Sequence, residues 1–174
     1  MKILALDLAR STGWAVGAPD TRPVYGSFRI QPGKASALRM GREVNRLIQD
    51  HEVTHVFFEQ PIKGSADRKK GRGGNYQKMR YLFGIAYLVE FLGEMSDCKV
   101  YEVNIGTWRK HFLGSANYNR GDAKRAAFTR CKQLGHTPET DDVAEAIGIL
   151  DYACSLYSKS HGIQTAPLFA SGGR

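Results

Sequence analysis

Two short apolar runs, each carrying an acidic residue near its end, constrain the fold of this chain most. Residues 2–8 read KILALDL and residues 53–59 read VTHVFFE. Nearly continuous apolar runs of this length are typical of buried strands in the middle of a sheet. A carboxylate in such a place is costly unless it is paired, hydrogen-bonded or bound to a cation. Asp7 and Glu59 are therefore candidate site residues, although Asp7 could also bond the turn backbone near Ser11 and Thr12.

The remaining patterns predict a mixed order of strands and helices. Further strands are expected at residues 14–16, opened by Gly13, at 24–30 and at 99–103, and the first three strands indicate an antiparallel meander. Helices are expected at residues 35–50, 75–95, 105–112, 122–134 and 139–157. This order differs from a regular βαβ alternation, and neither GxGxxG nor GxxxxGK[ST] occurs, which argues against Rossmann and P-loop nucleotide binding.

Two of the predicted helices carry informative apolar faces. The helix at 35–50 is expected to bury Leu38, Val44, Leu47 and Ile48. The helix at 75–95, with Asn75 as its N-cap, has an apolar set wide enough for a buried helix or for a partner surface.

Length and composition favour one domain inside a reducing compartment. We expect residues 1–157 to form a single domain and residues 158–174, which lack periodicity, to be a flexible tail. No window approaches the roughly 18 consecutive apolar residues of a membrane span, and the N-terminus does not resemble a signal peptide. The three cysteines lie far apart without metal-ligand spacing, so reduced thiols are expected.

A basic, glycine-rich segment indicates a polyanionic partner. Residues 63–80 hold seven basic residues and one acidic residue, and so carry +6 of the net charge of +8. Because the segment is interior and directly follows Glu59, a contact with the DNA backbone is favoured over a solvated surface. Its basic residues are Lys63, Arg68, Lys69, Lys70, Arg72, Lys78 and Arg80.

A second pair of acids lies at the start of the last predicted helix. Asp142 and Glu145 are three residues apart and share a helix face. Acids in this first turn, with Thr140 or Asp141 as the cap, could simply stabilise the helix by interacting with its dipole. However, the small neighbours of Glu145, which are Ala144, Ala146 and Gly148, indicate burial and would let the helix lie close to a sheet.

Four carboxylates in one place repel one another unless a cation neutralises them. Oxygen ligands without a His/Cys cluster favour Mg²⁺, with Mn²⁺ able to substitute. Two such ions per site would suit phosphodiester hydrolysis. Lys124 and Arg109 are the candidate residues for holding the scissile phosphate, and Lys124 is the candidate catalytic cation.

The order of these motifs resembles the RuvC-like Holliday junction resolvases over about residues 3–155. The motifs are DLARSTGWAV after the first strand, VFFEQP after the later one, and the acid pair on the last helix. The DLxxxTGWA form is most similar to the phage-borne branch of that family. The resemblance places Asp7, Glu59, Asp142 and Glu145 at the family's metal-binding acids. It likens Lys124 to the family's lysine and Arg109, five residues before Gly114, to its basic residue.

The resemblance implies a ribonuclease H-like α/β fold, with a mixed five-stranded sheet of three antiparallel strands followed by two parallel ones, flanked by helices. It also implies a homodimer that nicks a four-way DNA junction with Mg²⁺ or Mn²⁺ and no small-molecule cofactor. Such an endodeoxyribonuclease would act in the cytoplasm of a bacterial or phage-infected cell, with no membrane partner.

The sequence departs from the family pattern at two points. Leu8 and Ala9 stand where the family commonly has Pro-Gly, and Glu145 is one methylene longer than the usual Asp. A role for Asp141 as a ligand stays open. Two other functions also stay open: a nuclease of the same fold acting on RNA or an RNA–DNA hybrid, and a non-catalytic DNA-binding protein with a degenerate site.

Overall fold

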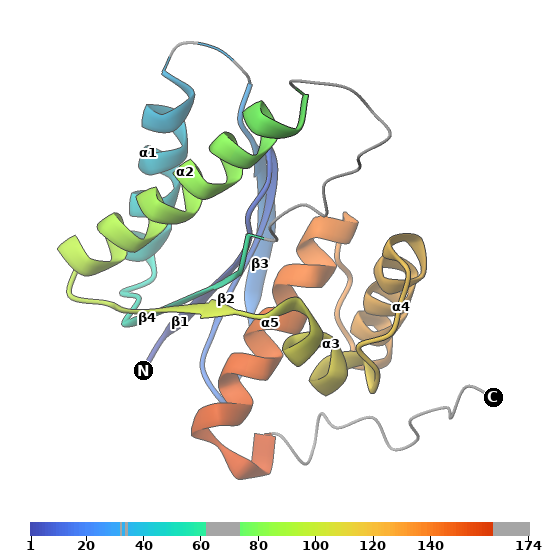
Figure 1. Cartoon of the computed structure of the whole chain (residues 1–174). Helices are drawn as coiled ribbons and strands as arrows, with labels where there is room; N and C mark the ends of the chain where they lie inside the picture. The colour runs from blue at the N-terminus through green and yellow to red at the C-terminus, as the bar shows by residue number, and fades with distance from the viewer. Residues whose placement is uncertain (32, 34, 62–73, 162–174) are drawn as a thin grey trace.

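The computed structural model describes residues 1–31, 33, 35–61 and 74–161. Its centre is one five-stranded sheet in the order β3-β2-β1-β4-β5 (Figure 1). The strands are β1 (Ile3–Asp7), β2 (Ser11–Gly17), β3 (Val24–Arg29), β4 (His55–Glu59) and β5 (Lys99–Val103). The first three are antiparallel neighbours, whereas β4 runs parallel to β1 and β5 parallel to β4. The predicted mixed sheet is confirmed.

The parallel register brings the two strand-end acids to one edge of the sheet. Leu6 of β1 aligns with Phe58 of β4, and an acid follows each of them directly. Because parallel strands end at the same edge, Asp7 and Glu59 leave the sheet side by side. The two apolar runs therefore meet as neighbouring strands.

Helices cover both faces of the sheet (Figure 1). α1 (Ser36–Asp50) and α2 (Gly74–Met95) lie on one face, and α3 (Ile105–Leu113), α4 (Arg120–Gln133) and α5 (Asp141–Tyr157) on the other. Side chains alternate along β1, so Ile3 joins the core under α5 and Leu4 the core under α1 and α2. Each face of the sheet thus has its own hydrophobic core.

Close packing of α5 on the sheet depends on Gly13. A Cβ atom at this position would lie 2.0 Å from the carbonyl oxygen of Asp142, so the contact admits only glycine. Gly13 lies inside β2, paired with Asp7, and does not open the strand as predicted. The small residue Gly148, expected to bring α5 close to the sheet, instead accommodates Trp108 and Phe112 of α3.

Helix starts differ from the predicted ones because of their caps. The Asn119 side chain accepts a hydrogen bond from the Asp122 N–H at 3.0 Å, so α4 begins at Arg120, two residues earlier than expected. The Thr140 hydroxyl accepts from the Val143 N–H at 3.3 Å, so α5 begins at Asp141 and not at 139. α2 begins at Gly74, one residue before the expected cap.

One predicted core residue is wrong. Leu38 is 55% exposed, and Met40 is buried in its place beside Val44, Leu47 and Ile48. Positions 40, 44 and 47 follow the helical i, i+4, i+7 spacing, from which Leu38 is displaced.

The three cysteines are free thiols, as expected, and all are buried. Burial raises the pKa of Cys131 and of Cys154 to about 12, which keeps both protonated and unreactive. Among the helices of the described residues, none has the length and apolar character needed to cross a membrane. Ser158 ends α5 in an extended conformation, and residues 159–161 form a short helical turn that brings His161 Nε2 to 3.2 Å from Asp151 Oδ1 of α5. Residues 162–174 lie outside the described residues.

Candidate active site

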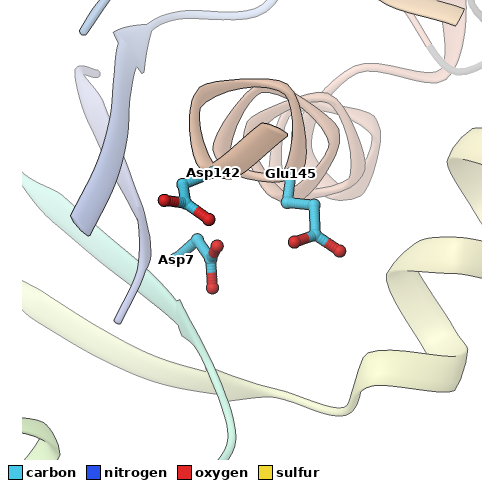
Figure 2. Close-up of side chains that lie close together, drawn as sticks. All are labelled: Asp7, Asp142 and Glu145. Atoms are coloured by element: carbon cyan, nitrogen blue, oxygen red, sulfur yellow. The ribbon is translucent and has the colours of Figure 1, made fainter. Parts of the chain in front are cut away.

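Three carboxylates from two elements converge beside the end of β1. Asp7 ends the strand, and Asp142 and Glu145 lie in the first two turns of α5. One carboxylate oxygen of each lies within 4.8 Å of the others. Figure 2 shows the Asp7 side chain directed toward α5 and the two helix acids projecting toward it. The predicted convergence of these three acids is present.

Burial and like charge strain this cluster. Burial is the largest cause that raises the pKa of Asp7 well above its ordinary value, and the charges of Glu145, Glu59 and Asp142 raise it further. Burial also raises the pKa of Glu145, although Lys124 and Arg109 oppose the rise. The site therefore holds more negative charge than its own residues neutralise.

Lys124 of α4 lies near all three acids at the start of α5. Its Nζ lies 3.2 Å from Asp142 Oδ1, 3.7 Å from Asp141 Oδ2 and 3.8 Å from Glu145 Oε2. Burial lowers the pKa of Lys124, but the hydrogen bond and charge of Asp142, with the other two acids, raise it above its ordinary value. Lys124 is thus a charged ammonium beside the cluster, where the sequence predicted it.

Arg109 of α3 also contacts the cluster. It is 8% exposed, and its Nη2 donates a hydrogen bond to Glu145 Oε1 at 3.1 Å. Its guanidinium also lies over the Trp108 ring, 5.4 Å from the centroid. Arg109 is therefore a buried partner of Glu145. A residue whose sole role is to contact DNA would be more exposed.

Glu59 lines the same cavity as the three clustered acids but is held by a separate contact. The indole Nε1 of Trp108 donates a hydrogen bond to Glu59 Oε2 at 2.8 Å. Sequence reasoning missed this role of Trp108. The available signal was that a buried indole N–H requires an acceptor.

The acids open into a cavity of about 440 Å³. Leu8 and Ala9, which replace the expected Pro-Gly, form part of its wall together with Lys78 of α2. The Asp141 side chain also lies near Lys124, but it is 51% exposed and stands outside the three-carboxylate group. This arrangement favours Asp142 and Glu145 over Asp141 as ligands.

The basic residues predicted to bind DNA are divided by the structure. Lys78 lines the acidic cavity, whereas Arg80 lines a separate groove between α1 and α2. The other members of the segment, Lys63, Arg68, Lys69, Lys70 and Arg72, lie outside the described residues.

The donor set suits a hard divalent cation. Within the described residues, the cluster offers carboxylate oxygens from Asp7, Asp142 and Glu145, with no histidine or cysteine among them. Mg²⁺ and Mn²⁺ prefer such oxygen ligands, and a cation would relieve the repulsion that raises the pKa of Asp7. The residues present therefore fit the metal that the sequence predicted.

Comparison with known proteins gives structural relatives only. No protein-family model matches the sequence, and no curated protein matches it. Thermus thermophilus RuvC matches with a TM-score of 0.65 and 14% identity, over 95% of this chain and 98% of that one. RuvC of T. thermophilus in complex with a Holliday junction substrate matches at 0.66 and 13%, over 97% and 99%.

A Fowlpox virus resolvase, solved with substrate Holliday junction DNA, matches with a TM-score of 0.57 and 15% identity, over 91% of this chain and 100% of that one. Identities this low establish the fold alone. Since the mixed five-stranded sheet and its flanking helices match over nearly the whole length of both chains, this protein has the ribonuclease H-like fold of RuvC.

Proposed function

We propose that this chain is a metal-dependent endonuclease that cuts branched DNA and resolves four-way Holliday junctions by phosphodiester hydrolysis. The observation that carries the proposal is the cluster of Asp7, Asp142 and Glu145, with Lys124 beside it, in an open cavity. The same fold occurs in two proteins solved with Holliday junction DNA. The DLxxxTGWA motif further supports the phage-type branch of these resolvases.

The site residues fall into three roles in this proposal. Asp7, Glu59, Asp142 and Glu145 would hold Mg²⁺ or Mn²⁺, two ions per site, which supply positive charge for activating water and for stabilising the leaving oxygen. Lys124, already an ammonium 3.2 Å from Asp142, would pair with the scissile phosphate at the cavity mouth. Arg109 keeps the Glu145 carboxylate fixed through its 3.1 Å hydrogen bond.

Selectivity for branched DNA would come from the basic segment that follows Glu59. Lys78, at the end of this segment, lines the acidic cavity, so the cations upstream of it lie close in sequence to the site. Replacing Arg68, Lys69, Lys70 and Arg72 by alanine should make the log–log salt slope of junction binding shallower by roughly 0.9 per lost phosphate contact. Binding to a linear duplex should weaken less, and an unchanged salt slope on both substrates would contradict this role.

Symmetric nicking needs two active sites, and α2 offers the surface for a second copy. Large apolar side chains spaced along one side of the helix are exposed: Tyr76 by 69%, Phe83 by 42%, Tyr87 by 69% and Phe91 by 49%. Two of them, Tyr87 and Phe91, also line a groove of about 490 Å³ between α1 and α2. An isologous dimer would bury both, because each copy presents the same patch. Sedimentation should give twice 19.3 kDa, and Phe91→Asp should give monomers.

The deciding experiment presents the protein with three labelled substrates. With Mg²⁺ or Mn²⁺, we expect paired, opposed nicks in a four-way DNA junction and little cutting of a linear duplex or an RNA–DNA hybrid. Preferential cutting of the hybrid would replace the proposal by an RNA-directed nuclease of the same fold. Junction binding without cleavage under any divalent cation would replace it by a DNA-binding protein. The Asp7→Asn variant is the matched inactive control.

A further inference from the structure

Trp108 is held between the acid of β4 and the helix that carries the other acids. The residue is fully buried. Its indole N–H donates to Glu59 Oε2 at 2.8 Å, while the six-membered ring abuts α5. A Cβ atom at Gly148 would lie 2.9 Å from Trp108 Cζ3, so the ring fills the space beside that glycine. One rigid side chain thus spans the distance between Glu59 and α5.

The path of the chain explains why Trp108 reaches Glu59. Glu59 pairs in register with Val103, the last residue of β5. Asn104 then caps α3, accepting a hydrogen bond from the Gly106 N–H at 2.9 Å. Trp108 lies in the first turn of this helix, and its indole N–H reaches the Glu59 carboxylate at 2.8 Å. The contact follows from a strand end and a helix start that lie next to each other.

The next residue of α3, Arg109, contacts an acid of α5. Arg109 donates to Glu145 at 3.1 Å and lies over the Trp108 ring. Two consecutive residues of α3 thereby contact two carboxylates that line the same cavity, Glu59 and Glu145. Trp108 also contacts α5 at Gly148, about one turn after Glu145. Such partners orient metal ligands in other proteins.

We propose that Trp108 is a positioning residue, whose indole N–H and ring hold the Glu59 carboxylate at a set distance from the acids of α5, so that Glu59 joins them in binding a divalent cation. This inference rests on the proposed metal site. Beyond the proposed site, it says that the position of the fourth ligand, Glu59, depends on the buried indole of Trp108 in α3.

The test measures metal binding without DNA, and therefore without activity. Trp108→Phe keeps an aromatic ring for Arg109 but removes the N–H donor. Phe112→Leu is the matched control, because Phe112 lies in the same helix, is fully buried and abuts the same Gly148. Titration calorimetry with Mn²⁺ should show binding weakened by about tenfold in Trp108→Phe and by less than about twofold in Phe112→Leu.

A double-variant cycle separates positioning from packing. In the Glu59→Gln background, Trp108→Phe should cause no further loss of Mn²⁺ affinity. Residue 59 is then no longer a carboxylate ligand, so its orientation by Trp108 no longer matters for metal binding. An equal loss in both backgrounds would assign the effect to packing and overturn the proposal. Wild-type affinity in Trp108→Phe would overturn it as well.

A spectroscopic measurement covers the case in which Trp108→Phe does not fold. The chain has two tryptophans, so Trp14→Phe leaves Trp108 as the sole indole emitter. Adding Mg²⁺ should change its emission, and the change should be absent when Glu59→Gln is added. No change with Mg²⁺, in a protein that calorimetry shows to bind Mn²⁺, would contradict the inference. If Asp7→Asn also bound Mn²⁺ with wild-type affinity, the metal site itself, and with it the proposed function, would fail instead.

Discussion

Helix α5 buries two carboxylates in different electrostatic surroundings. Glu145, near its start, is 6% exposed and lies near two other acids as well as Arg109 and Lys124. Asp151, about two turns later, is 7% exposed and lies between two histidines. His111 Nε2 lies 2.8 Å from one Asp151 oxygen, and His161 Nε2 lies 3.2 Å from the other. Equal burial therefore accompanies two different chemistries.

The pKa shifts record the difference. Burial raises the pKa of Glu145, and the opposing cations do not reverse the rise. Burial would also raise the pKa of Asp151, but the hydrogen bonds from His111 and His161 lower it below its ordinary value. A buried acid by itself does not mark an active site. A group of buried acids whose charges are not neutralised is a better indicator, because a bound cation would relieve their mutual repulsion.

The largest expected effect is on DNA cleavage, which should depend on the acids of the Asp7 cluster and not on Asp151. Asp7→Asn, Asp142→Asn and Glu59→Gln should each lower junction cleavage by roughly a thousandfold or more, since each removes several kcal/mol of transition-state stabilisation by the metal. Junction binding, measured by gel shift in Ca²⁺, should stay. Asp151→Asn should cleave normally at a temperature where it is folded. Retained cleavage in two of the three site variants would contradict the four-acid site.

A smaller effect separates the regions by stability. Asp151→Asn removes the charge that two histidines face, so it should lower the free energy of unfolding by about 3 kcal/mol. Asp7→Asn removes a repelled charge and should raise that free energy when metal is absent. Urea denaturation in EDTA measures both. The comparison between the two ends of α5 would be wrong if both substitutions changed stability in the same direction.

The smallest effect is the pH dependence of that stability. The folded-state pKa of Asp7 is raised above 3.8, so its contribution is fully present below that pH and is lost as pH rises through the folded-state pKa. In EDTA, the stability gained by Asp7→Asn should therefore be largest near neutral pH and vanish toward pH 4. Asp151 has a lowered pKa, so its contribution is present above 3.8 and is lost as pH falls.

Addition of Mg²⁺ sharpens this pH comparison. The cation should remove most of the stability difference between the wild type and Asp7→Asn at neutral pH, because it neutralises the repelled charges. It should leave the difference between the wild type and Asp151→Asn unchanged. Equal responses of the two differences to Mg²⁺ would show that the metal does not bind at the Asp7 cluster.

Much of the candidate site was predictable because its signals are local. An acid that ends an apolar strand is visible in the sequence, as with Asp7, and so is the i, i+3 pair on α5. Lys124, which was expected near the acids, lies 3.2 Å from Asp142. The Trp108–Glu59 hydrogen bond joins residues 49 positions apart, and no periodicity connects them.

By itself, the sequence determined the order of strands and helices and identified the acids, since hydrophobic periodicity and residue chemistry are properties of short segments. Tertiary structure decided which acids face one another. Gly13 lets α5 lie against β2, which turns Asp142 and Glu145 toward Asp7 and leaves Asp141 exposed. The tertiary structure also places Lys78 in the acidic cavity and Arg80 in the groove between α1 and α2, although both lie on one helix. These outcomes depend on how segments distant in the sequence pack, and packing contacts of that kind leave no pattern within a single segment.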